Sequence, residues 1–429
     1  MRALIVTLGS RGDVQPFIAL GMALRDRGHE VSLCTPDRFE SFVTDHGLGF
    51  LPADGGFIDL LESEEGKQLI EELRSLWGTL KASARLMRRV RELIGSFLED
   101  AWTRARDFQP DLLVLGSKGI MGSAIAARLG IPAALVMPLP QLVPHGDFPV
   151  VGFPRLPFGP AYNRATHRFV LLMTGFYARM LEDFRTNTLD LPPARGVAGL
   201  LADLDGRPWP ILHCYSPQLV PRPREWPDHA SVDGFWFLDR DADWQPPEEL
   251  LRFLDAGTAP VCIGFGSMAG RFPEQVTTAA LDAVKAAGIR AILLTGWGGL
   301  QAGDLPSSIH ATDQVPHDWL FERCSAVVHH GGAGTTGAGL RAGLPTLICP
   351  FGLDQPFWGQ RVHALGVGPE PVPQRQLRRR GIAAELADLV GNDGYRERAR
   401  ALAERIAGDP GPADVARRLE TLQRTWPYP

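Results

Sequence analysis

Short, continuously apolar runs alternate with helix-forming stretches along both halves of the chain, and this alternation restricts the folds it can adopt. The runs occupy residues 3–8, 31–34, 111–115, 133–137, 211–215, 261–265, 290–295, 326–329 and 346–349. The helical stretches include residues 121–129, 273–287, 335–342, 382–389, 396–406 and 413–422. A run without polar alternation indicates a strand buried on both faces of a parallel sheet. The sequence therefore predicts an α/β protein with two parallel sheets, one in each half.

The chain of 429 residues is too long for one ordinary core and predicts two domains of roughly 200 residues each. Residues 217–230 contain four prolines and several charges, which is typical of a linker. We expect an N-terminal domain over residues 1–216, closed by the strand at 211–215, and a C-terminal domain over residues 231–408. The last helix, within residues 409–429, is expected to pack back toward the N-terminal domain. Because ligands bind beyond the carboxyl ends of parallel strands, a cleft between the domains is the expected site.

The composition is that of a soluble globular protein, with 45% hydrophobic and 22% charged residues. The net charge of −5 gives no overall field that would attract nucleic acid or acidic lipid. Five scattered cysteines have neither metal-site spacing nor a disulfide framework, so we expect a cytoplasmic protein. The first apolar run is too short for a signal peptide, and no stretch reaches the ~18 apolar residues that a membrane span needs.

Two segments suggest contact with apolar molecules. Residues 81–91 form a basic amphipathic stretch that can lie on a membrane, but acidic residues on both sides favour a helix packed on its own domain. We therefore expect peripheral membrane contact at most. The apolar and aromatic residues over 148–176 indicate either domain core or a site for a hydrophobic acceptor.

The segment His-His-Gly-Gly-Ala-Gly-Thr-Thr, at residues 329–336, lies between a buried run and a helix-forming stretch. Glycines at such a junction let backbone N–H groups approach an anion, and the helix N-terminus adds a positive dipole end. The neighbouring imidazole can donate to a phosphate oxygen. The segment therefore predicts a diphosphate site that needs no metal.

Residues 332–337 also spell GxGxxG, the pattern of dinucleotide-binding turns, and residues 264–269 imitate it. In such a site the acidic residue ends the next strand, whereas Asp354 falls beyond Pro350 in a loop. An NAD-dependent oxidoreductase is therefore the disfavoured alternative.

The glycine segment belongs to a longer pattern. Together with residues 315–320, 341–345 and 354–358, it closely resembles the donor-binding region of family 1 glycosyltransferases. The nearest groups are the sterol glucosyltransferases and the vancomycin-type antibiotic glycosyltransferases. Residues 9–16 are similar to the opening motif of the same family. The resemblance implies a GT-B fold, in which two Rossmann-like domains with parallel sheets face across a cleft, and a metal-independent reaction that inverts the anomeric carbon.

The resemblance also implies roles for individual residues. Val315 would face the nucleobase, and Asp354 and Gln355 would hold hydroxyls of the donor sugar. His329 is expected to be buried in the sheet. The donor diphosphate would lie against Ser267, His330, Gly331, Gly332, Gly334 and Thr335. Plant relatives carry a tryptophan roughly at Gln314 that stacks on uracil; its absence here leaves UDP- and dTDP-sugars both open as the co-substrate. No other cofactor is expected.

Asp13 is the expected general base, because it lies on the loop that leaves the first strand, where a cleft residue belongs. A carboxylate is charged at neutral pH and can accept the proton of an acceptor hydroxyl. Ser10, Arg11 and Gly12 are further cleft candidates. The alternative is that Asp13 only caps a helix beginning near Pro16. We favour the base, because capping alone does not require the glycine-rich approach before it.

Three DxD triplets, at residues 203–205, 239–241 and 241–243, imitate metal-binding motifs but lie in or near polar, proline-bearing connections, so no metal site is expected. The predicted activity is an inverting transfer of a hexose to a hydroxyl of a sterol, polyketide or other hydrophobic aglycone. A nucleotide-sugar epimerase on the same fold is the alternative, and a catalytically silent auxiliary protein is a third possibility.

Overall fold

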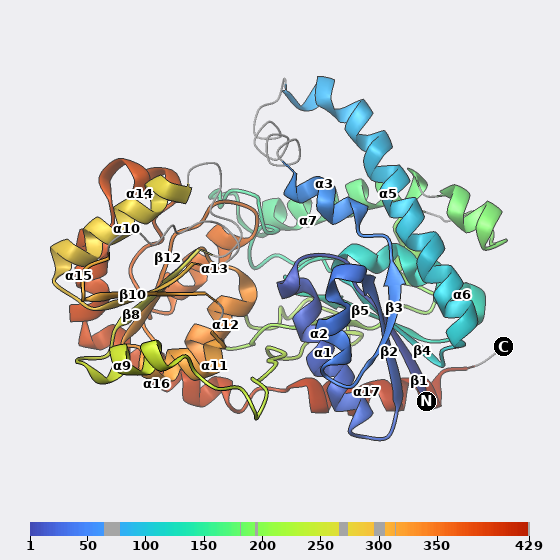
Figure 1. Ribbon diagram of the computed structural model, residues 1–429. Coiled ribbons are helices and arrows are strands. Elements are labelled where there is room, and N and C mark those ends of the chain that lie inside the picture. The colour runs from blue at the N-terminus through green and yellow to red at the C-terminus, as the bar shows by residue number, and fades with distance from the viewer. Residues whose placement is uncertain are drawn as a thin grey trace. The chain divides into compact units, whose positions relative to one another are not determined.

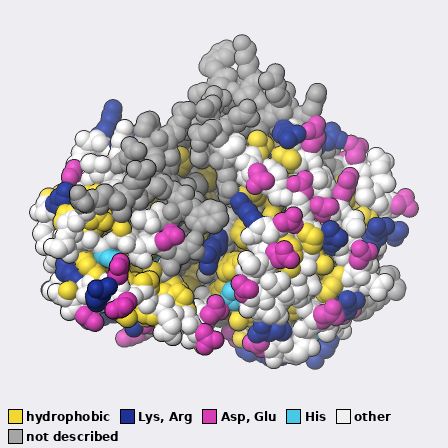
Figure 2. Space-filling model, viewed as in Figure 1, with side chains coloured by type: hydrophobic (Ala, Val, Ile, Leu, Met, Phe, Trp, Pro, Cys, Tyr) yellow, Lys and Arg dark blue, Asp and Glu magenta, His cyan; other side chains and the backbone are white. Residues whose placement is uncertain are grey.

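The computed structural model describes residues 1–63, 78–180, 182–193, 196–265, 273–295, 305–313 and 315–427 (Figure 1). The chain divides into two compact units. Unit 1 consists of Met1–Cys214, Arg222–Leu238 and Pro410–Pro429, and unit 2 of Tyr215–Pro221 and Asp239–Asp409. On the face shown in Figure 2, acidic and basic side chains are interspersed rather than gathered into one field.

Unit 1 is built on a seven-stranded parallel sheet of order β3-β2-β1-β4-β5-β6-β7. Its strands are β1 (Arg2–Val6), β2 (Glu30–Pro36), β3 (Gly49–Ala53), β4 (Leu112–Gly116), β5 (Ala133–Met137), β6 (Ile211–His213) and β7 (Ala230–Val232). Alternate residues of the central strand β1 enter different cores. Leu4 and Val6 join the cluster on one face, and Ala3 and Ile5 join the cluster on the other. This two-sided burial explains why the strand is continuously apolar.

Helices cover both faces of this sheet. They are α1 (Arg11–Arg25), α2 (Glu40–Thr44), α3 (Gly56–Glu62), α5 (Gly78–Phe108), α6 (Ser123–Leu129), α7 (Gly159–Met180), α8 (Ala198–Leu201) and α17 (Pro412–Thr425). The last of these, α17, packs on α1 and buries Val415, Ala416 and Leu419 in the core that α1 shares. Arg27 and His29 both bond to Glu420. The C-terminal helix is therefore part of unit 1.

Two local expectations differ from the structure. First, α1 begins at Arg11 rather than near Pro16, because Ser10 and Asp13 form a capping box five residues earlier and Pro16 is accommodated inside the helix. Second, the strand at 211–215 does not close the first sheet. Residues 222–238 return to unit 1, where β7 pairs with β6, so the expected linker over 217–230 is divided between the two units.

Unit 2 carries a five-stranded parallel sheet of order β10-β9-β8-β11-β12. The strands are β8 (Val261–Gly264), β9 (Ala291–Leu294), β10 (Ile309–Thr312), β11 (Ala326–His329) and β12 (Thr346–Ile348). Its helices are α9 (Glu248–Asp255), α10 (Pro273–Ala287), α11 (His317–Leu320), α12 (Ala333–Arg341), α13 (Gln355–Ala364), α14 (Gln374–Arg380), α15 (Ala383–Gly391) and α16 (Asp393–Ile406). The predicted α/β class with two parallel sheets is confirmed. Among the described residues, no helix has both the length and the hydropathy that a membrane span requires.

Candidate active site

The glycine segment forms the turn between β11 and α12, at the carboxyl end of β11, which lies between β8 and β12 in the sheet of unit 2. Gly331 has φ +97°, and a Cβ there would lie 2.6 Å from Ile348 Cγ2, so this position requires glycine. The Gly331 N–H donates to His329 Nδ1 at 2.9 Å. His329 is 1% exposed, and burial together with the neighbouring His330 lowers its pKa. The expectation that His329 is buried in the sheet is therefore met.

No described side chain caps the N-terminus of α12. Gly332 is its N-cap and offers no side chain to the first-turn N–H groups, while Thr336 Oγ1 turns back to donate to the Gly332 carbonyl. A Cβ added at Gly334 would meet no atom of any described residue within 4 Å, and this glycine is exposed. Backbone N–H groups at residues 333–335 thus present donors and a positive dipole end to a space that the described part of the chain does not fill. This arrangement suits an anion.

His330 lies beside this turn, and one of its ring nitrogens is already hydrogen-bonded. The ring bonds to the backbone of Gly264, at the end of the adjacent strand β8, while Nδ1 is buried without a partner among the described residues. Burial and the nearby His317 lower the pKa of His330 to about 4. A neutral ring that donates its N–H to Gly264 has only an acceptor left at Nδ1. It can donate to a phosphate oxygen only when it gains a second proton.

Asp354 and Gln355 follow β12 and open α13, and both take part in folding the turn. Asp354 is the N-cap, and its Oδ2 accepts a 2.9 Å hydrogen bond from Trp358 Nε1. Gln355 is 3% exposed, and its Oε1 accepts the N–H of Phe351 at 2.7 Å. Leu353, directly before them, has φ +56° and a side chain that is 63% exposed. A non-glycine residue in this region marks a locally strained turn, which is common at binding sites.

Ser267 and Val315 are the other two residues expected at the donor site. Ser267 lies outside the described residues, as does Gln314. Val315 is 7% exposed, and its side chain packs in the core cluster that includes Trp319 and Leu320. A contact between Val315 and the nucleobase stays a prediction. Because the side chain is buried, the backbone of Val315 would make most of this contact.

In unit 1, Asp13 is the third residue of α1 and sits at the carboxyl end of β1. Its Oδ2 accepts the Ser10 N–H at 2.8 Å and the Ser10 hydroxyl at 3.0 Å, which completes the cap. A Cβ on Gly9 would lie 2.2 Å from the same oxygen, so the carboxylate occupies space that only glycine leaves. Arg11 lies over the Phe42 ring at 4.5 Å, and Gly12 is exposed. Capping and the close glycine approach therefore occur together.

Lys118 completes this constellation and was not predicted from the sequence. Its Nζ donates to Asp13 Oδ1 at 2.6 Å, and the two side chains are 35% and 22% exposed. Lys118 follows β4, which pairs with β1, so adjacent parallel strands deliver both charges to one edge of the sheet. A lone charge directly after a buried apolar run was the available signal.

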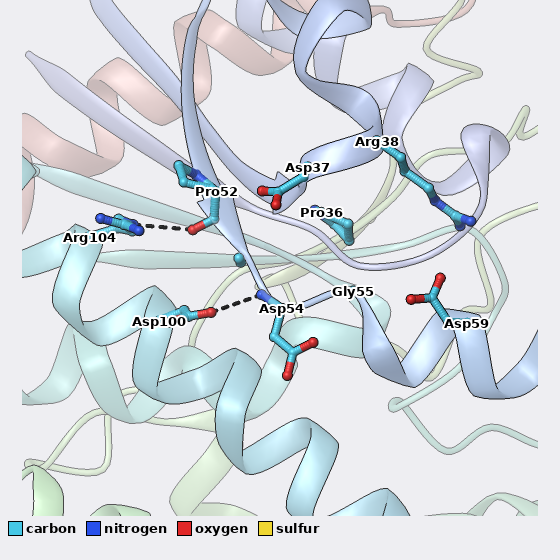
Figure 3. A pocket seen from close by; sticks show the side chains of 10 residues that line it. Pro36, Asp37, Arg38, Pro52, Asp54, Gly55, Asp59, Asp100 and Arg104 are labelled. Carbon is cyan, nitrogen blue, oxygen red and sulfur yellow. Dashed lines mark hydrogen bonds between the residues drawn. The ribbon is translucent and has the colours of Figure 1, made fainter.

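A polar pocket of about 490 Å³ lies at the carboxyl ends of β2 and β3 (Figure 3). Asp100 and Arg104, from α5, reach the backbone of the β3 end: Asp100 accepts the Asp54 N–H at 2.8 Å and Arg104 donates to the Pro52 carbonyl at 3.1 Å. The remaining lining includes Pro36, Asp37, Arg38, Ala53, Gly55 and Asp59. Four carboxylates and two guanidinium groups suit a polar rather than an apolar molecule.

Two of the three DxD triplets use their first carboxylates in ion pairs. Asp203 pairs with Arg207 and Asp239 with Arg341. Across the described ranges, no group of three or more histidine, cysteine or acidic side chains has the arrangement of a metal site.

Comparison with known proteins matches both parts of the chain. Residues 3–106 match the glycosyltransferase family 28 N-terminal domain, and residues 291–422 match the erythromycin biosynthesis protein CIII-like C-terminal domain. A sterol 3-beta-glucosyltransferase of Arabidopsis thaliana is 34% identical over 97% of this chain, which spans 65% of that relative's length.

Solved structures share the fold along the whole chain. The glycosyltransferase SnogD from Streptomyces nogalater has a TM-score of 0.66 at 22% identity, covering 99% of each chain. A spinosyn rhamnosyltransferase complexed with thymidine diphosphate has a TM-score of 0.67 at 21% identity, covering 98% of this chain and all of the other. At this level of identity the likeness concerns the fold alone.

Proposed function

We propose that this chain is an enzyme with the GT-B fold that moves a hexose from a UDP- or dTDP-sugar to a hydroxyl of a hydrophobic small molecule. Two observations on other proteins support the substrate classes. The Arabidopsis relative acts on a sterol, and a structural neighbour was solved with thymidine diphosphate.

The observation that carries the proposal is the N-terminus of α12, which no described side chain caps. In a transfer of this kind, the bond between the anomeric carbon and the diphosphate breaks, and negative charge grows on the departing oxygen. The N–H groups at residues 333–335 and a protonated His330 would stabilise that charge through fixed dipoles that need no rearrangement. We infer a reaction in which these groups, rather than a metal ion, bear the charge of the leaving group.

Asp13 is the proposed base. As the acceptor oxygen bonds to the anomeric carbon from the face opposite the nucleotide, its proton passes to the Asp13 carboxylate, and the configuration inverts. Ser10 and Lys118 hold that carboxylate from both sides at 2.6–3.0 Å, which fixes its orientation. A carboxylate has about four lone-pair positions, so these bonds leave capacity to accept a proton.

Asp13→Asn is the sharpest test, because an asparagine oxygen can still accept the Ser10 bonds and keep the helix cap. We expect kcat to fall by roughly 10²–10⁴-fold, while stabilisation by UDP stays near wild type. Asp26→Asn is the matched control, because Asp26 lies at the other end of the same helix and is also in an ion pair, with Arg25.

The assay follows nucleotide release from a set of UDP- and dTDP-sugars with and without aglycones. Release that requires an acceptor indicates transfer, and a changed sugar without an acceptor indicates epimerisation. Full activity of Asp13→Asn would refute the base. Loss of turnover in excess chelator would refute the metal-independent reaction.

A further inference from the structure

The middle of α7 and the loop before this helix carry an exposed apolar surface. Phe158, Leu172 and Phe169 are 68%, 69% and 50% exposed. We call the full set the α7 patch: Phe153, Leu156, Phe158, Phe169, Leu172 and Met173. The sequence left residues 148–176 open between domain core and acceptor site, and these six side chains do not belong to the core.

The orientation of α7 is fixed from its other face. Thr166 and His167 are buried: Thr166 Oγ1 accepts the Val150 N–H at 2.9 Å, and a ring nitrogen of His167 lies 3.2 Å from the Phe148 carbonyl. Phe153 packs its ring against Phe169 at 5.9 Å, which joins the loop to the helix. Because Thr166 and His167 hold one face of α7 against the protein, the apolar side chains on its other face point to solvent.

The charged residues within this segment of the chain all have one sign. Residues 148–180 contain four arginines and neither aspartate nor glutamate, although the whole chain has a net charge of −5. Arg164 pairs with Glu225. Arg155 and Arg168 are exposed and form no ion pair with any described residue. Exposed aromatic and leucine side chains flanked by arginines are the composition of a helix that lies in a membrane interface.

We propose that the α7 patch docks unit 1 onto an anionic lipid bilayer. Six side chains that are this exposed enclose little of a small ligand, whereas a bilayer can take up all of them. A second copy is disfavoured, because pairing two such faces would bring like charges together. The excess negative charge elsewhere repels an anionic surface, so the patch sets the orientation of approach. The proposal is separate from the transfer reaction.

Vesicle co-sedimentation tests it with the full chain. We expect binding to phosphatidylcholine vesicles that contain phosphatidylglycerol and weak binding to phosphatidylcholine alone. Arg155→Gln with Arg168→Gln should weaken binding to the anionic vesicles about 30-fold, since each arginine near such a surface contributes about fivefold. Phe158→Ser with Leu172→Ser should weaken binding to them by about tenfold or more.

Leu204→Ser is the matched control, because Leu204 is 52% exposed in unit 1 but lies between Asp203 and Asp205. It should bind vesicles as the wild type does. An unchanged melting midpoint of each variant shows that it is folded. Failure of the wild type to bind anionic vesicles would overturn the proposal, as would wild-type binding by Phe158→Ser with Leu172→Ser. Variants that lose self-association but keep vesicle binding would assign the patch to a second copy instead. The vesicles hold neither donor nor acceptor, so none of these results bears on glycosyl transfer.

Discussion

Replacing Gly334 with alanine should stabilise the free protein and weaken its nucleotide binding. The residue is helical, exposed, and has no described atom within 4 Å of an added Cβ, so the fold itself does not require glycine there. Alanine at a compatible glycine position adds about 0.4–1 kcal/mol of stability, which raises the melting midpoint of unit 2 by about 1–4 °C. If a diphosphate lies against the first turn of α12, the same methyl group occupies its place. We expect the affinity for UDP to fall at least about tenfold, or about 1.4 kcal/mol.

Two other glycines make this experiment specific. Gly391 ends α15, and an added Cβ there also meets no described atom, so Gly391→Ala should leave UDP affinity unchanged. Gly331→Ala should lower stability instead. A left-handed φ costs about 1–2 kcal/mol for alanine, and contact with Ile348 at 2.6 Å adds about 1–3 kcal/mol of overpacking. Thermal melts with and without UDP, together with calorimetric titration, measure all three variants. Wild-type UDP affinity in Gly334→Ala would refute the placement of the diphosphate at this helix.

Two further predictions concern buried histidines. His213 is 0% exposed, and burial lowers its pKa to about 4, so the unfolded chain binds the extra proton first as pH falls below about 6.5. His213 alone should cost unit 1 up to about 3 kcal/mol of stability between pH 6.5 and 4. In urea melts across pH, His213→Gln should remove this part of the pH dependence, while the buried His145 and His167, whose pKa values are also lowered, keep the remainder. UDP binding near neutral pH should be accompanied by uptake of about one proton at His330, because the neutral ring has no donor left for a phosphate oxygen. Titration calorimetry in buffers of different ionisation enthalpy measures this proton uptake. His330→Asn should abolish it.

Periodicity was sufficient to predict most of the fold. The expected runs at 326–329 and 346–349 correspond to β11 and β12 within one residue, and the helix expected at 273–287 is α10. These elements are decided locally, by burial on both faces of a strand or one face of a helix. By contrast, β7 has three residues in a proline-bearing segment and exists because it pairs with β6. Such pairing leaves no periodic pattern in the sequence.

At the candidate site, the glycine turn between β11 and α12 was predictable from the sequence, whereas its ligand stays a prediction. Glycines between a buried strand and a helix indicate an anion site whatever the surrounding side chains do. Contacts between side chains were harder to predict from the sequence. Lys118 meets Asp13 from 105 residues away, through a strand order that the sequence does not state. Trp358 lies one helical turn from Asp354, and that spacing could have indicated their hydrogen bond.

Asp13 shows why a structural role and a catalytic role need not exclude each other. The sequence set the base against the helix cap, and the structure shows that the cap exists. A cap alone would be served by Ser10 without Lys118 and without a glycine pressed against the carboxylate. At Asp13, one oxygen is tied to the helix N-terminus, the other is held by a lysine from the adjacent strand, and Gly9 makes the room. Holding both oxygens in this way costs side-chain freedom at a partly exposed strand end. It is expected where a carboxylate must keep one orientation toward a substrate, and the cap then supplies half of that orientation.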